Sequence, residues 1–600
     1  MGVLAELKRR KVFRVGAAYL VVAWLAVQAA SIGFPAFDAP AWVLRVFILV
    51  LLLGFPVALV MAWVFDVTHE GVKVEPAAPG TRRMIAFSAG LAALAIAWYF
   101  LGQPAYRGTP GSGPASAAPG KSIAVLPFTD LSPGHDQEYF SDGVAEEILN
   151  ALVRVKGLKV AGRTSSFSFK GKNEDLRAIG RTLGVAHVLE GSVRKQGDKV
   201  RITAQLIQSE DGFHLWSQTY DGDLHDVFEL QERIARGITG ELQVILEGDP
   251  KRRLVPVSTR SPEAYGLFLQ ATAVLNRRDG ARFPDAEAQL EQAIRLDPAF
   301  ARAHARLAAL LALSPAYQPR VTERSLVEAE RHARDAIALD PSLAEPHATL
   351  GLVFSQKRRY LEERAEFGKA LELDPEDETA RFWSGTSLVI EGYARAGVVE
   401  FDRTLAIDPM FPNAVMWRAV QYLEQGDLDA GERLMHRAAD LGLATVSDMR
   451  GDRAEAARQL ASGLRALAGD LEPGAADAIA RGVFGDEAAR AQGLAAVDAY
   501  LARKPAVVAG IAPYALIRLG KPVRALEVLA DRPCGNEAMV FGLVWSQYGR
   551  SLRALPEFPA FVRKIGLAGL WDRYGPPDLC RREGDGRYNC DGASEPSARR

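Results

Sequence analysis

Residues that could perform catalytic chemistry are scattered along this 600-residue chain and match none of the spacings that known reactions require. The sequence has no GxxxxGK(S/T) phosphate loop, no HExxH zinc pair, no GxSxG elbow and no CxxC pair. Gly120-Lys121-Ser122 comes nearest to a phosphate loop, but Ala115 stands where the leading glycine should be, and a predicted strand follows. Four of the nine dispersed histidines fall in predicted helices, where packing or solvent explains them: His69, His135, His187, His214, His225, His304, His332, His347 and His436. We therefore predict no enzyme, no catalytic residue and no bound cofactor or metal.

Two further groups of residues suit metal or redox chemistry. Asp221, Asp223, His225 and Asp226 offer spaced oxygens and an imidazole, but the glycine and distal glutamate of a calcium loop are missing, so no metal is predicted. The three cysteines are too few for a disulfide scaffold: Cys534, Cys580 and Cys590. The last two could close a small disulfide in an oxidising compartment, and two free surface thiols are the alternative. Cys534 is expected to be unpaired.

Composition excludes two broad classes. With 72 basic and 73 acidic residues the net charge is -1, so nothing in the bulk charge favours nucleic acid as a partner. The 48% hydrophobic and 24% charged residues are typical of a globular chain and exclude disorder or a fibrous structure over most of the length.

The first 102 residues are predicted to be a membrane leader with three transmembrane helices. Residues 15–37, 46–65 and 84–102 contain no charged residue, and each run reaches the ~20 residues that cross a bilayer. Basic residues precede the first run and lie in the second connection, which predicts a cytoplasmic N-terminus and a periplasmic C-terminal part in a bacterial inner membrane. Residues 103–120, rich in Pro, Gly and Ala, are predicted to be a flexible linker.

Residues 121–250 are predicted to form a small α/β domain, because short apolar runs alternate with amphipathic helical segments. The expected order is βαβα, an antiparallel meander of three strands and a closing helix, at residues 123–128, 139–155, 158–161, 174–183, 186–194, 199–208, 213–220 and 226–247. In the middle strand of the meander Val200, Ile202, Ala204 and Leu206 share one face, so the other face should be half solvated.

This region resembles the TolB amino-terminal-like (FlgO-type) domain of bacterial envelope proteins. The resemblance runs over residues 122–235, in SIAVLPFTDLSPGHDQEYFSDGVAEEILNAL, LKVAGRTSSFSFKGKNEDLRAIGRTLGVAHVLEGSVRKQGDKVRITAQLI and DGFHLWSQTYDGDLHDVFELQERIA. It implies a multidomain protein with a repeat array, in a family whose partners include winged-helix regulators and class III cyclase catalytic domains; neither module is recognisable in this sequence. The membrane leader resembles the one often found upstream of this domain. The resemblance implies no catalytic residues.

Several motif residues of this region have a structural interpretation. Asp142-Gly143 and Glu190-Gly191-Ser192 are expected to serve turn, cap or bulge geometry, with ligand binding as the alternative. Trp216 and Tyr220 share one face of a predicted strand and are expected to cover the sheet.

An array of helix pairs is predicted over residues 260–555. Asp-Pro recurs at residues 297–298, 340–341, 374–375 and 408–409, and the last two intervals are 34 residues, a period that resembles the tetratricopeptide repeat. Six positions match the packing residues of that repeat: Leu350, Gly351, Phe354, Phe367, Ala370 and Pro375. Two depart from it, since His347 stands where the family usually has Trp and Glu363 where it prefers a small residue. Residues 556–600 are expected to form a C-terminal cap and tail.

Together these patterns predict a multidomain membrane protein: three transmembrane helices, a small α/β domain and an all-α tetratricopeptide-type solenoid. The predicted function is an inner-membrane-anchored periplasmic scaffold that binds protein partners through its solenoid, because stacked repeats present a long surface and no catalytic constellation is present. The alternative is a transmembrane sensor that passes the state of the envelope to a cytoplasmic regulator.

Overall fold

The computed structural model describes residues 120–172, 174–244, 253–317, 323–438, 441–467, 471–503, 511–531, 542–584 and 586–590. Of the first 119 residues it describes 19, 22–23, 26–27, 51, 54–55, 65–68 and 71–74. The chain divides into two compact units, Met1–Ser116 and Ala117–Arg600, which are described separately.

In the first unit, the described residues show one ring contact and one hairpin. The Tyr19 hydroxyl donates a hydrogen bond to the Leu51 carbonyl oxygen at 2.8 Å, and its ring centroid lies 5.7 Å from that of Phe55. Strand β1 (Phe65–Thr68) pairs antiparallel with β2 (Gly71–Val74), with Phe65 opposite Val74.

The predicted membrane leader is corrected by the structure. Among the described residues, no helix has both the length and the apolar character needed to cross a membrane. The longest described helices hold 17 residues, and the second predicted span ended at Phe65, which begins strand β1 instead. The prediction counted uncharged residues alone, and a run of that length crosses a bilayer only as one continuous helix. The membrane part of the fold class, the integral membrane contact and the inner-membrane location are therefore wrong; most of residues 15–37, 46–65 and 84–102 lies outside the described residues.

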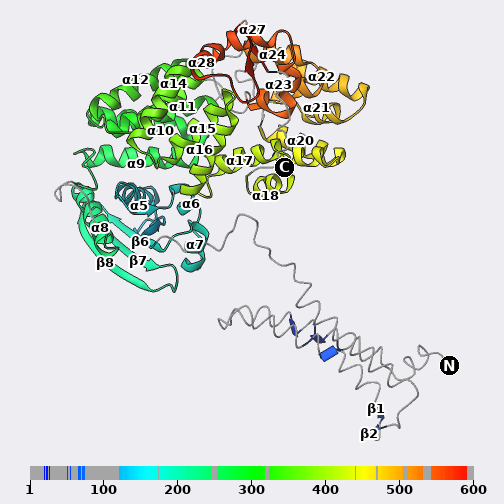
Figure 1. Cartoon of the computed structure of the whole chain (residues 1–600). Coiled ribbons are helices and arrows are strands. Elements are labelled where there is room, and N and C mark those ends of the chain that lie inside the picture. The colour runs from blue at the N-terminus through cyan, green and yellow to red at the C-terminus, as the bar shows by residue number, and fades with distance from the viewer. Residues whose placement is uncertain are drawn as a thin grey trace. The chain divides into compact units, whose positions relative to one another are not determined.

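The second unit begins with a mixed sheet whose strand order is β5-β3-β6-β7-β8, with β4 also paired to β6. Figure 1 shows β6, β7 and β8 of this sheet side by side. The strands are β3 (Ser122–Val125), β4 (Thr129–Asp130), β5 (Lys159–Val160), β6 (His187–Gln196), β7 (Lys199–Gln208) and β8 (His214–Asp223). Strand β3 runs parallel to β5 and β6, whereas β6, β7 and β8 form an antiparallel meander.

Helices cover both faces of this sheet because its strand β3 is apolar on both sides. Ile123 and Val125 face one core with α5 (Glu138–Val153) and α8 (Val227–Glu241), whereas Ala124 faces a second core with α7 (Leu176–Leu183). These elements follow the predicted order closely. The short helix α6 (Arg163–Phe167) and strand β4 were not predicted.

The remainder of the unit is a tetratricopeptide-like solenoid of antiparallel helix pairs. The pairs are α9 (Pro262–Arg277) with α10 (Phe283–Leu296), α11 (Ala301–Tyr317) with α12 (Glu323–Leu339), α13 (Glu345–Gln356) with α14 (Tyr360–Leu373), α15 (Glu378–Ile390) with α16 (Ala394–Ile407), α17 (Pro412–Glu424) with α18 (Leu428–Ala438), α19 (Leu441–Met449) with α20 (Arg453–Leu467), α21 (Ala475–Phe484) with α22 (Glu487–Ala502), and α23 (Ile511–Arg518) with α24 (Pro522–Ala530). The first helices of successive pairs pack on each other, α11 on α13 and α13 on α15.

The α/β region and the first helix pairs share a single hydrophobic core. That core is continuous from Ile148 of α5 through Phe268 of α9 and Leu307 of α11 to Phe354 of α13. A second core joins the last helix pairs to the C-terminal helices α26 (Arg550–Arg553), α27 (Phe558–Lys564) and α28 (Leu567–Tyr574). Domain boundaries had been predicted near residues 250 and 555. Each hydrophobic core extends across one of these boundaries, so the division into separate domains stays a prediction.

Candidate functional site

Five of the six predicted packing residues lie on α13 and α14. Leu350, Phe354, Phe367 and Ala370 are almost fully buried, and Pro375 follows the end of α14. A Cβ atom at Gly351 would lie 2.6 Å from the Phe367 ring, so glycine is what allows the two helices to approach. His347, which stands where the tetratricopeptide repeat usually has Trp, contacts the facing helix: its Nδ1 lies 2.6 Å from Glu366 Oε2.

Substituting Gly351 by alanine is expected to destabilise the fold by about 1 to 3 kcal/mol, because the added methyl group must displace the Phe367 ring. The matched control is Gly368→Ala on α14, where no atom lies within 4 Å of the added Cβ; helix propensity predicts a gain of about 0.5 to 1 kcal/mol there. Chemical denaturation of the two variants measures both effects. Equal stability of the two would show that the helices do not depend on close approach at Gly351.

The Asp-Pro turns lie along one edge of the solenoid, and the α/β region packs against that edge. Asp408 shows this most clearly, since its fully buried carboxylate accepts hydrogen bonds from the backbone N–H groups of Thr164 and Ser165 at 3.0 and 2.8 Å. The Ser165 hydroxyl also bonds Asp408 and in turn accepts from the Met410 N–H at 2.7 Å. A Cβ at Gly162 would lie 2.4 Å from the Asp408 Cβ, so glycine is required for this approach.

Buried ion pairs join α5 to the first helix pairs. Glu147 of α5 receives both terminal nitrogens of Arg302 of α11, at 2.7 and 2.5 Å, and its side chain is 8% exposed. Glu146 accepts from Arg163 Nε at 2.8 Å and from Asn276 Nδ2 of α9 at 2.9 Å. Buried charges of this kind need their partners, because desolvation without pairing is costly. The α/β region and the solenoid are therefore held together by paired polar groups as well as by apolar packing.

Two motifs that were expected to serve turn, cap or bulge geometry lie inside regular elements. Asp142 and Gly143 are within α5, and a Cβ at Gly143 would lie 2.7 Å from Leu269 of α9. Burial raises the pKa of Asp142, which pairs with Lys170 at 2.5 Å. Gly191 lies within β6, where a Cβ would meet the Phe128 ring at 2.9 Å. Both glycines therefore serve close approach between elements.

Where the α/β region meets the first helix pair, the surface is hollowed by a cleft of about 420 Å³, here called the seam cleft. One wall comes from the loop before α5 and the start of that helix, and the other from α9 and the turn that follows it. Its lining residues are His135, Asp136, Glu138, Tyr139, Gln270, Ala273, Val274, Arg277, Asp279 and Arg282. The lining carries both signs of charge. Hydrogen bonds from Lys170 and Arg277 hold the pKa of Glu138 below its usual range, so this wall stays anionic.

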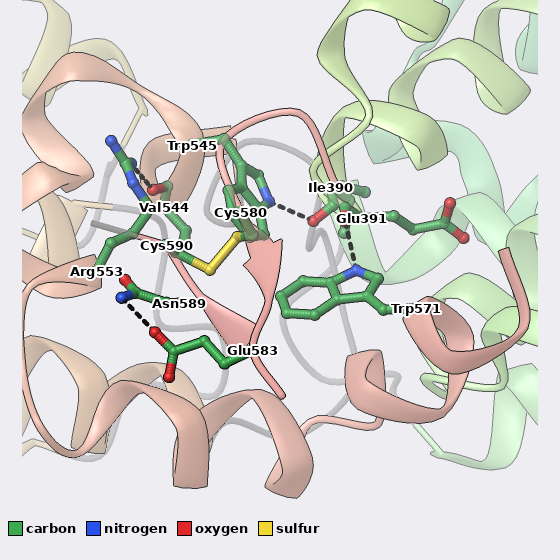
Figure 2. The surroundings of a disulfide bond; sticks show 10 residues. All are labelled: Ile390, Glu391, Val544, Trp545, Arg553, Trp571, Cys580, Glu583, Asn589 and Cys590. Atoms are coloured by element: carbon green, nitrogen blue, oxygen red, sulfur yellow. Dashed lines mark hydrogen bonds between the residues drawn. A yellow bond between two sulfur atoms is a disulfide. The ribbon is translucent and has the colours of Figure 1, made fainter. Parts of the chain in front are cut away.

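The opposite edge of the solenoid is covered by the C-terminal residues 542–590, here called the C-terminal region. Figure 2 shows two indoles reaching the turn after α15: Trp545 Nε1 donates to the Ile390 carbonyl at 2.6 Å, and Trp571 Nε1 donates to that of Glu391 at 3.0 Å. Gly392, with φ of 96°, leaves space for Pro577, since a Cβ there would lie 2.7 Å from that ring.

The C-terminal region ends in a small hairpin that holds the two cysteines of the predicted disulfide. Strands β9 (Arg581–Arg582) and β10 (Tyr588–Asn589) pair, and the structure joins Cys580 to Cys590 beside them (Figure 2). In the cell the bond stays a prediction, because it requires an oxidising compartment.

Two of the acidic residues that had been weighed as a metal loop form ion pairs with basic side chains. Asp221 pairs with Arg201 Nε at 2.6 Å and Asp223 with Lys199 Nζ at 2.7 Å, both across strands β7 and β8. Trp216 and Tyr220 lie together against α8, with ring centroids 6.4 Å apart and Gly237 beneath them.

Among the described residues, one cluster that sequence reasoning missed has ligand types for a metal ion: His304, His332 and Asp335. The histidines had been assigned to packing or solvent. His304 lies on α11 and His332 on α12, so only the antiparallel pairing of the two helices brings them together. The His332-x-x-Asp335 spacing, which places two ligand types on one helix face, was the available signal.

Comparison with known proteins covers parts of the chain. A family model described as HilA/YgeH-like transcriptional regulator, second domain, matches residues 119–236, which does not confirm the resemblance to the TolB amino-terminal-like family. A protein of Rhizobium meliloti (strain 1021) named "Putative adenylate cyclase 3" is 40% identical over 186 residues, which are 31% of this chain and 32% of that protein. The chain therefore spans about a third of the length of this relative.

Similar solved structures include three helical repeat proteins or complexes. Pseudomonas aeruginosa PilF has 18% identity and a TM-score of 0.27, over 35% of this chain and 93% of that one. The tetratricopeptide repeat protein YrrB, described as having an unusual peptide-binding site, has 18% identity and a TM-score of 0.21, over 32% and 90%. Yeast Tom70 has 12% identity and a TM-score of 0.30, over 94% and 98%. All three TM-scores are low, and the solenoid fold rests on the helix packing described above.

Proposed function

We propose that this chain is a non-enzymatic protein-interaction scaffold in which the α/β region and the first helix pairs bind a partner protein as one body. The observation that carries this function is their single continuous core, reinforced by the Glu147–Arg302 and Asp408–Ser165 contacts. A solenoid that hinged against the α/β region would present a variable surface. One shared core instead fixes the relative positions of residues from both parts.

The seam cleft is the docking site in this proposal. Its volume of about 420 Å³ is large enough to take one or two side chains of a partner segment, and its walls belong to both halves of the body. The lining alternates acidic Asp136 and Asp279 with basic Arg282, which suits a segment carrying both signs of charge. A partner bound here contacts both parts at once.

The test compares two alanine-to-phenylalanine variants of the full chain. Ala273→Phe fills the seam cleft from α9, whereas Ala288→Phe adds the same ring at an exposed position of α10 outside it. A photoreactive amino acid at Arg282, on the cleft wall, is used to capture partners, with the exposed Arg295 as the control position. We expect one protein crosslinked from position 282, its binding weakened at least about tenfold by Ala273→Phe, or about 1.4 kcal/mol, and unchanged by Ala288→Phe. Equal binding by both variants would exclude the seam cleft as the docking site.

A second candidate function is signal transduction, and the Rhizobium relative favours it because its name refers to an adenylate cyclase. In that function residues 122–235, as a TolB amino-terminal-like domain, and the solenoid together sense a partner and pass its state to a regulator. The name of a relative that shares 186 residues is support by association. Incubation of the full chain with ATP and Mg²⁺ tests the non-enzymatic assignment; we expect no cyclic AMP, and its formation would show that the chain is itself a cyclase.

A further inference from the structure

His304, His332 and Asp335 converge between α11 and α12. The two Nδ1 atoms are 3.0 Å apart, and His304 Nδ1 lies 3.9 Å from Asp335 Oδ2. The three possible ligand atoms lie within 4.8 Å of one another. Both imidazoles are buried, and the Asp335 side chain is 43% exposed, so the cluster opens to solvent on its carboxylate side.

The hydrogen bonds around the pair fix the position of each proton. His304 Nε2 lies 3.3 Å from the Pro298 carbonyl oxygen, so it carries a hydrogen and leaves Nδ1 as a lone pair. His332 Nε2 lies 2.8 Å from Arg331 Nη2, a donor, so the His332 hydrogen is on Nδ1 and points at His304.

We propose that His304, His332 and Asp335 form a binding site for a first-row divalent cation of the zinc class, with water as the fourth ligand. Two imidazole nitrogens that bind one Zn²⁺ tetrahedrally at about 2.05 Å are about 3.3 Å apart, close to the spacing here. The Asp335 oxygen, within 4.8 Å of both imidazole nitrogens, needs to approach by up to about 1.5 Å to reach the same spacing, which a half-exposed side chain allows. The bond from His304 Nε2 to a backbone carbonyl is the outer-sphere contact that metal-bound histidines commonly make.

Binding of the cation requires two local changes, and both involve Arg331. His332 transfers its hydrogen from Nδ1 to Nε2 through exchange with water, which leaves Nδ1 free as a ligand and conserves the proton. The new Nε2–H then faces the Arg331 donor, so this 54% exposed side chain must turn away and give up its 3.3 Å contact with Asp335. Arg331 is therefore a competitor that opposes the cation by charge and by occupying Asp335.

The site would link α11 to α12 two residues after Arg302, which bonds the α/β region. Cation binding is therefore expected to stabilise the solenoid near its junction with that region, since a ligand that binds only the folded chain shifts the unfolding equilibrium. This site is separate from the seam cleft, so neither result depends on the other.

The test is titration of the metal-stripped full chain with ZnCl₂ and, separately, CoCl₂ by calorimetry in buffer without thiols or chelators. We expect a single specific site, weakened at least about tenfold by His304→Ala, His332→Ala or Asp335→Asn, and tightened about tenfold by Arg331→Ala, which removes an adjacent positive charge. The control is His347→Ala, a histidine of the next helix pair that contacts Glu366 and should leave the titration unchanged.

A specific site is distinguished from nonspecific metal binding because substitution of a ligand should weaken binding whereas Arg331→Ala should tighten it. Circular dichroism confirms that each variant is folded, and Asp335→Asn, at a half-exposed position, keeps the test valid if a histidine variant unfolds. The proposal would be overturned if the wild-type chain bound neither metal. It would also be overturned if the wild-type chain and the His304→Ala/His332→Ala double variant bound the metal with equal affinity.

Discussion

Replacing Arg302 by leucine is expected to lower the free energy of unfolding by about 3 to 5 kcal/mol, because it leaves the Glu147 carboxylate buried without a partner. The Glu147 side chain is 8% exposed and that of Arg302 is 18% exposed, so water cannot replace the lost ion pair. Urea denaturation followed by circular dichroism measures the loss. Hydrogen exchange should rise in both α5 and α11, since the pair joins the α/β region to the solenoid.

A double-mutant cycle distinguishes a buried charge from a simple loss of packing. Glu147→Leu combined with Arg302→Leu is expected to recover more than half of the lost stability, because two well-packed apolar side chains replace a buried ion pair at little cost. The control is Arg458→Leu, which removes an exposed pair with Glu455 and should change stability by less than about 1 kcal/mol. If the double variant were as unstable as Arg302→Leu, an unpaired Glu147 would not explain the effect.

The alternation of apolar and polar residues, the 34-residue repeat and the turn residues in the sequence predicted most helices and strands of the α/β region and of the first helix pairs of the solenoid. The middle strand of the meander was correctly placed at residues 199–208, because Val200, Ile202 and Leu206 alternate with polar residues and all three are buried. After Pro409, where Asp-Pro no longer marks the helix ends, the array was predicted to continue to residue 555 without most of its helices being placed; the structure has helices α17 to α24 there. Local sequence patterns were therefore enough to predict many of the helices and strands.

Contacts between distant parts were beyond prediction, because no local pattern encodes them. Asp408 matched the repeat signature, yet its carboxylate bonds Ser165, 243 residues earlier in the chain. Gly143 was expected to serve turn, cap or bulge geometry, whereas it lies within α5 and lets Leu269 approach that helix. The membrane prediction was wrong for a related reason: the length of an apolar run does not say whether one continuous helix forms. The missed His304 and His332 belong to the same class, since only helix pairing unites them.

Trp571 is the residue on which attachment of the C-terminal region depends most. Its side chain is 1% exposed, and its indole N–H donates to the Glu391 carbonyl (Figure 2). Its ring centroid lies 5.8 Å from that of Trp545 and 5.1 Å from that of Tyr588. Through Tyr588 it also supports the hairpin beside the disulfide. One indole therefore connects the solenoid turn, the helix α28 and the hairpin.

Trp571→Ala is expected to cost about 3 to 5 kcal/mol, from the lost apolar burial and the cavity that remains. Because Gly392 and Pro577 pack beside the same turn, hydrogen exchange should increase at residues 390–395 and 575–590 together, while the α/β region stays protected. Trp571→Phe retains most of the ring and loses the bond to Glu391, so it should cost only about 1 to 2 kcal/mol. A large loss in stability without increased exchange at residues 390–395 would mean that the C-terminal region is held to the solenoid by other contacts.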